Sequence, residues 1–162
     1  MPILDVIQGA QSMSDVEKII WGAFGGITVY IVGQLLSKFF IEPLYELRKV
    51  VGEVRFNLVF HAPTIHTPIG RSKETSDAAQ EALLKSSCDL IAKLYAVPLY
   101  ETTRLFSFGV LPPRKAVESA AVQLRGLSTY VHEEGEKANV SIEIIVNRVA
   151  KIESLLGLKP LE

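Results

Sequence analysis

The segment IIWGAFGGITVYIVGQLLSKFFI, from Ile19 to Ile41, decides the fold that the sequence predicts. It carries no charged side chain between Ile19 and Ser37. At 1.5 Å per residue, a helix over this uncharged part is about 28 Å long, close to the ~30 Å hydrocarbon core of a bilayer. The core helix of a soluble domain usually carries a polar face, whereas only isolated polar residues interrupt this segment. We therefore interpret residues 19–41 as a transmembrane helix.

The composition agrees with one span and one modest soluble domain. The chain has 162 residues, 48% of them hydrophobic and 22% charged, so its apolar residues are concentrated rather than spread. Its 17 Lys and Arg nearly balance its 18 Asp and Glu. This balance excludes a strongly basic surface, and we expect no DNA partner. Cys88 is the single cysteine, which excludes an intramolecular disulfide and a cysteine-based zinc cluster.

The flanks of the span predict its orientation. Residues 1–18 form a leader that lacks the basic region of a secretory signal, so we expect the helix to remain in the mature protein. Lys18 is the only basic residue close to the N-terminal flank, whereas four lie on the C-terminal side, within the last turn of the span or beyond it: Lys38, Arg48, Lys49 and Arg55. The positive-inside rule then predicts an outside N-terminus and a cytoplasmic main part.

Residues 42–158 show helical periodicity throughout. Apolar residues at spacings of three and four, bounded by proline, glycine and capping residues, predict four amphipathic helices over these ranges: 44–62, 72–97, 114–134 and 137–156. Pro43 is a place where a helix kinks or restarts, and residues 63–70 are interpreted as a loop. Residues 159–162 are assigned as a tail. The predicted fold is all-α, with one N-terminal transmembrane helix followed by a cytoplasmic antiparallel four-helix bundle.

Small residues gather near one face of the span. Gly22, Gly26, Gly33 and Ser37 lie there, and the first two form a GxxxG motif. Small residues at this spacing allow close approach of helix backbones in lipid, where no hydrophobic drive favours helix association. The partner of this face is another copy of the chain or another membrane protein.

A polar stripe marks the other end of the span. Gln34, Lys38 and Glu42 are spaced at i, i+4 and i+8. The ammonium group of Lys38 can extend to the lipid headgroups. In a ring of identical helices, the same stripe would line the mouth of a pore.

The three histidines, His61, His66 and His132, are the side chains best suited to acid–base chemistry near neutral pH. They have no HExxH motif, no accompanying cysteines and no carboxylate triad. We therefore expect neither a metal site nor a cofactor.

Two of these histidines follow an arginine at a short distance. The segments Arg55-FNLVF-His61 and Arg125-GLSTYV-His132 resemble the R-x4-6-H signature of HEPN ribonucleases, which are all-helical and cleave RNA between two copies of the motif. That resemblance implies that Arg125 holds a phosphate while His132 moves a proton at the ribose 2′-hydroxyl. The residue after each arginine is Phe or Gly, whereas HEPN sites usually have a polar residue there.

Two further resemblances concern membrane proteins. A single-span helical protein with a degenerate HEPN-like motif is similar to the accessory pore proteins of type VI CRISPR systems. The chain also resembles a group of small bacterial membrane proteins of unknown function, which implies a shared anchor and a bacterial inner membrane. The segments that carry this second resemblance are FIEPLYELRKVVGEV from Phe40, NLVFHAP from Asn57, VPLY from Val97, GVLPPR from Gly109 and LRGLS from Leu124.

These observations predict a membrane-anchored homo-oligomer that acts as a scaffold or pore without catalytic activity. Walker, Rossmann and nucleophile-elbow motifs are missing from the sequence. Two alternatives remain open. One is a membrane-tethered, HEPN-like ribonuclease with RNA as its partner, and the other is a single-span accessory subunit of a larger membrane complex.

Overall fold

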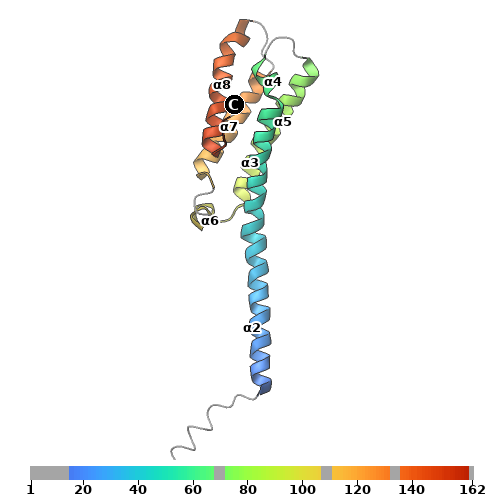
Figure 1. Ribbon diagram of the computed structural model, residues 1–162, viewed down its shortest axis with the longest axis vertical. Coiled ribbons are helices and arrows are strands. Elements are labelled where there is room, and N and C mark those ends of the chain that lie inside the picture. The colour runs from blue at the N-terminus through green and yellow to red at the C-terminus, as the bar shows by residue number, and fades with distance from the viewer. Residues whose placement is uncertain (1–14, 68–71, 107–110, 132–135, 161–162) are drawn as a thin grey trace, which may run out of the picture. The chain divides into compact units, whose positions relative to one another are not determined.

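A computed structural model describes residues 15–67, 72–106, 111–131 and 136–160. All regular secondary structure in these ranges is helical, so the predicted all-α class is confirmed (Figure 1). Most of the predicted leader and residues 161–162 of the predicted tail lie outside the described residues. The chain divides into two compact units, residues 1–38 and 39–162.

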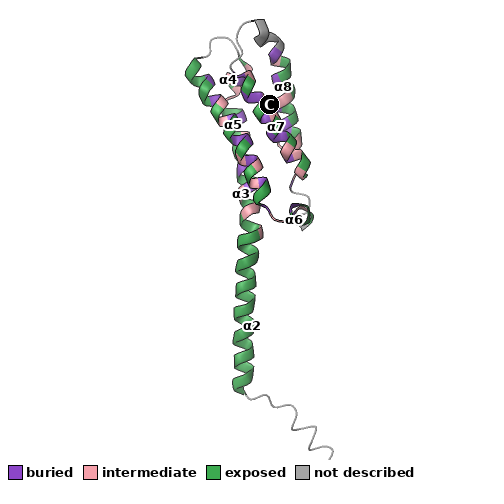
Figure 2. Ribbon diagram, turned by 180° about the vertical axis from the view of Figure 1, so that it is seen from behind, coloured by how far each residue is buried: buried purple, intermediate pink, exposed green. Residues whose placement is uncertain are grey.

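The first unit contains helix α2, Asp15–Leu36, and the beginning of the π-helix η1, Ser37–Ile41. No residue of α2 is buried, and its large apolar side chains are between 48% and 73% exposed (Figure 2). The helical backbone runs without interruption from Asp15 to Phe60, and its N-terminal part is long and apolar enough to cross a bilayer. By length and composition, it is the one candidate span among the described residues.

The expected restart of a helix at Pro43, with the proline in its first turn, is confirmed. Helix α3, Glu42–Phe60, follows η1 directly, and Pro43 lies in its first turn. A proline removes one hydrogen bond, and its ring clashes with the carbonyl group four residues before it, here that of Phe39. The five-residue π turn contains Phe39 and widens the helix at this point. The chain therefore accommodates Pro43 by a change of helix type.

The prediction of a loop over residues 63–70 is wrong for the first half of this range. Residues Ala62–His66 form the short helix α4, with Pro63 in its first turn. The amide of Ile65 donates to the carbonyl of His61 over 2.8 Å, and the Ile65 side chain is buried. Proline is compatible with the first turn of a helix, because an N–H group at this position would have no acceptor within the helix.

The remaining helices agree closely with the predicted ranges. They are α5, Lys73–Ala96; α6, Tyr100–Phe106; α7, Arg114–Tyr130; and α8, Glu136–Leu156. Ser72 caps α5, because its Oγ accepts a hydrogen bond from the amide of Thr75. Helix α7 was predicted to reach residue 134, whereas it ends at Tyr130.

Gly157 ends α8 as its position predicted. Its φ is 65°, a left-handed value that glycine adopts without steric cost. The amide of Leu158 donates to the carbonyl of Glu153, and the amide of Gly157 donates to that of Ser154. These two bonds form a Schellman motif, which turns the chain sharply out of the helix.

The second unit has one hydrophobic core. Helix α5 packs against α3 and α7, and α7 packs against α8, whereas α3 meets α8 only sparsely. Buried residues, purple in Figure 2, occur along all four of these helices and form a common core. The largest fully buried side chains are Leu47, Leu58, Ile65, Leu83, Leu90, Leu94, Leu124, Leu127 and Ile152. Small residues at the contact of α5 with α7 allow a direct bond there, in which Ser87 donates to the carbonyl of Ala121.

Leu124→Ala is expected to lower the free energy of unfolding by about 2 to 5 kcal/mol, because it leaves a cavity at a fully buried position of α7. Val122→Ala on the exposed side of the same helix is the matched control, with an expected effect of about 0.5 kcal/mol or less. Denaturant unfolding of the full chain in mild detergent, followed by circular dichroism, measures both. Equal effects of the two substitutions would contradict the described core.

Candidate functional site

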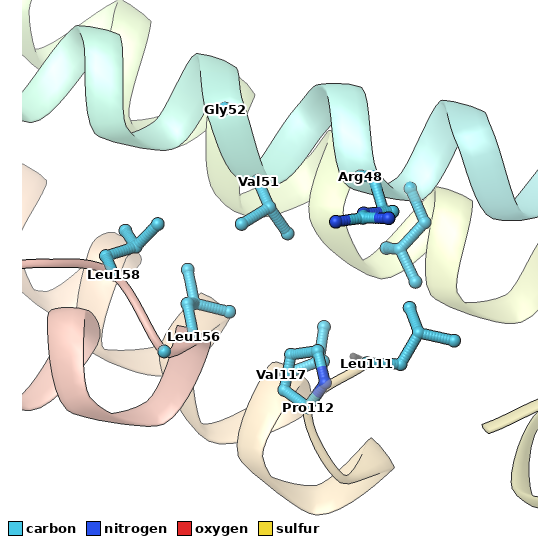
Figure 3. A pocket seen from close by; sticks show the side chains of 10 residues that line it. Arg48, Val51, Gly52, Leu111, Pro112, Val117, Leu156 and Leu158 are labelled. Atoms are coloured by element: carbon cyan, nitrogen blue, oxygen red, sulfur yellow. The ribbon is translucent and has the colours of Figure 1, made fainter. Parts of the chain in front are cut away.

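A pocket of about 300 Å³ lies in the second unit, and we call it the α3–α8 pocket. It lies where α3 passes the start of α7 and the end of α8, the region in which α3 lacks a close neighbour (Figure 3). Its lining residues are Leu47, Arg48, Val51, Gly52, Leu111, Pro112, Val117, Leu156, Gly157 and Leu158. Pockets that bind small molecules begin at about this volume.

The lining of this pocket is aliphatic apart from one cation. Its leucine and valine side chains come from α3, α7, the end of α8 and the segment before α7, and Arg48 is the only lining residue with a polar side chain. Arg48 is exposed, and no hydrogen bond or ion pair joins its side chain to another residue of the described ranges. In Figure 3 its guanidinium group lies at the α3 side of the pocket, across from Leu111 and Pro112. The site therefore combines an apolar interior with a single available positive charge.

Gly52 forms part of the α3 wall. It lies in the middle of a 19-residue helix, where glycine is less favourable than alanine by about 1 kcal/mol. A Cβ atom at this position would meet no heavy atom within 4 Å, apart from its own neighbouring backbone. Packing within the described chain therefore does not require glycine here.

The far side of the pocket is held in place by the end of α8. The Schellman turn at Gly157 directs Leu158 toward α3, and the guanidinium group of Arg55 donates to the carbonyl of Lys159. Tyr100 supports the segment before α7, because its hydroxyl donates to the carbonyl of Pro112 over 2.8 Å. Burial, reinforced by the nearby Glu101 carboxylate, raises the pKa of the Tyr100 phenol and keeps it a donor.

The glycine face predicted in the span is open. Gly22, Gly26 and Gly33 are exposed, and a Cβ atom at any of them would meet nothing within 4 Å. Ser37 is also exposed and begins the π-helix. No described part of the chain packs on these residues, so any use of this face requires a partner.

The predicted polar stripe is interrupted. Gln34 ends in α2, Lys38 lies in the π-helix and Glu42 begins α3, and all three are exposed. The stripe was predicted from α-helical spacing. A π-helix places more residues in each turn, so the i+4 rule does not apply between Lys38 and Glu42.

The first HEPN-like pair has separate partners. Arg55 donates to the Lys159 carbonyl, whereas the His61 ring lies edge-on to Phe60, with 5.0 Å between the ring centroids. Partial burial lowers the pKa of His61 and favours its neutral form. His66 ends α4 and is half-buried.

The second HEPN-like pair is only partly described. Arg125 is exposed on α7, and His132 lies outside the described residues. The ribonuclease hypothesis therefore stays a prediction from the sequence pattern. Within the described ranges, His, Cys, Asp and Glu form no group of three or more suited to a metal ion.

Gly126, which follows Arg125 in the second HEPN-like segment, has a packing role that the sequence did not predict. Arg148 of α8 lies across it, donates to Oε1 of Gln123 over 2.8 Å and places its guanidinium carbon 5.4 Å from the centroid of the Tyr130 ring. A Cβ atom at Gly126 would collide with this guanidinium group. The Nε of Arg148 is buried and has no hydrogen-bond partner among the described residues.

Comparison with protein-family models, with curated proteins and with solved structures finds no match to this chain.

The contact between Gly126 and Arg148 predicts a non-additive pair of substitutions. In an Arg148→Ala background, Gly126→Ala is expected to raise the free energy of unfolding by about 1 kcal/mol, because alanine favours the helix. In the native background this gain is expected to be lost, since the new Cβ displaces Arg148 from Gln123 and Tyr130. A double-mutant cycle in denaturant measures the difference, and additive effects would contradict the contact.

Proposed function

We propose that this chain is a single-span protein of a bacterial inner membrane that assembles with copies of itself into a scaffold. Helix α2 crosses the bilayer with its N-terminus outside, and residues 42–158 form a cytoplasmic antiparallel four-helix bundle. The observation that carries the proposal is the complete exposure of an apolar helix of 22 residues. Such a helix is about 33 Å long, enough for the ~30 Å hydrocarbon core.

The polar groups of α2 are compatible with lipid. The Thr28 hydroxyl donates to the carbonyl of Phe24 over 2.8 Å, so its hydrogen-bonding capacity is met within the helix. Lys18 forms an ion pair with Asp15 at the first turn, with a distance of 3.2 Å. Both charges belong at the aqueous boundary of a span.

The packing of the second unit supports the bundle. Helices consecutive among the four long ones are neighbours, in the order α3, α5, α7 and α8. The connection between α7 and α8 covers only residues 131–135, and a connection this short favours antiparallel packing of the pair. This arrangement accounts for a single core shared by all four helices.

A scaffold accounts for α2 better than a pore does. Lining an aqueous channel requires a continuous polar face. Thr28 and Gln34 are six residues apart and point about 120° apart around the helix, so they do not share a face. Gly22, Gly26 and Gly33, in contrast, do lie on one face of α2. This glycine face allows close backbone contact between copies of the helix.

The test is the molar mass of the full chain in mild detergent, measured by light scattering. We expect a multiple of the chain mass, and a shift to smaller species in the Gly22→Leu, Gly26→Leu double variant, because bulky side chains separate the helix backbones. Thr28→Leu is the control, since Thr28 lies about 120° from Gly22 and about 160° from Gly26 on the helix. Its mass should equal that of the native chain.

Two results would contradict the proposal in different ways. A native chain that is monomeric at every concentration would exclude a homo-oligomeric scaffold. An unchanged oligomer in the double variant would show that the glycine face is not part of the interface and that the bundle makes the contact between copies.

A further inference from the structure

The α3–α8 pocket is not used by the proposed scaffold. All its lining residues belong to the second unit. We infer that this pocket binds an anionic amphiphile, with one acyl chain in the aliphatic interior and a carboxylate or phosphate head at Arg48.

The size of the pocket fits a single acyl chain. A volume of about 300 Å³ lies at the lower end of the range of pockets that bind small molecules. An acyl chain that lies against the leucine and valine side chains of the lining buries its own apolar surface.

The chemistry of the lining argues against a more polar ligand. A sugar, nucleotide or peptide needs several donors and acceptors for its own polar groups. Arg48 is the only polar side chain among the ten lining residues, so the ligand has one charged end and an aliphatic remainder. The guanidinium group presents paired N–H donors that match a carboxylate or a phosphate. Because Arg48 has no anionic partner within the described ranges, the ligand displaces no existing ion pair.

Gly52 is the second observation. A glycine in the middle of α3 is unfavourable for the helix, and its missing side chain leaves open space at the pocket wall. An occupant that lies against the α3 backbone accounts for this glycine, whereas the packing of the described chain does not.

The experiment uses the full chain in phosphatidylcholine nanodiscs and a decanoic acid that carries a diazirine in its chain. After irradiation and proteolysis, mass spectrometry locates the label. We expect saturable labelling of the segments 47–52, 111–117 and 156–158. Decanoic acid should compete at least tenfold better than decanol, because the alcohol lacks the charge that Arg48 recognises.

Paired variants test the two residues that carry the inference. Arg48→Gln should lower pocket labelling at least tenfold, whereas Lys49→Gln, which removes the same charge one residue away, should not change it. Gly52→Leu should abolish pocket labelling by filling the space, and a Cβ atom at this position meets no heavy atom within 4 Å. Ala78→Leu adds a side chain of the same kind at an exposed position of α5 and should leave the label in place.

The inference is overturned if these segments stay unlabelled, if Gly52→Leu labels as the native chain does, or if decanol competes as well as decanoic acid. Nanodiscs that contain phosphatidylglycerol identify the source of the ligand. Suppressed labelling in these discs shows that the bilayer lipid occupies the pocket, and unchanged labelling shows that a free anionic amphiphile does. The mass measurement on the same samples reports separately on the scaffold.

Discussion

Helix α2 exposes large apolar side chains on all its faces, and no described part of the chain covers them. The hydrophobic effect disfavours this exposure in water by about 25 cal/mol for each Å² of apolar surface. A surface of this kind requires an environment other than water, supplied by lipid, by copies of the chain or by both. The membrane anchor proposed for this protein follows from that requirement.

The second unit meets the same physical demand in another way. It buries one set of apolar side chains in a common core, and α7 lies between α5 and α8 with buried residues repeated at helical spacing. Ala120, Ala121 and Ser87 are small enough to bring α5 and α7 into direct contact. Helix α3 packs mainly against α5, so its other flank is not closed by α8. The pocket is a consequence of this uneven packing.

The sequence predicted the long helices well, because their ends have local signals. Ser72 caps α5, Pro98 follows it closely, and Gly157 turns the chain after α8. Two features escaped prediction. The π-helix depends on how the backbone accommodates Pro43, and α4 depends on the burial of Ile65 by other helices. Neither cause can be read from a local pattern.

Less of the candidate site than of the fold could be predicted from the sequence. Arg48 entered only as one of the basic residues after the span, since a pocket depends on the spacing between helices far apart in the sequence. The cover of Gly126 by Arg148 depends on the register of α8 against α7, which apolar periodicity does not determine. Gly52 alone gave a local signal, because it is a glycine within an otherwise strong helical pattern.

Gly52 also has a consequence for protein engineering. Replacing a mid-helix glycine whose Cβ has free space is among the simplest ways to raise thermal stability. In this chain, a bulky replacement would stabilise α3 and at the same time obstruct the wall of the α3–α8 pocket. A stability screen that does not measure ligand binding would favour large side chains at residue 52. A thermostabilised variant selected in this way would be a poor reagent for identifying the ligand of the native protein.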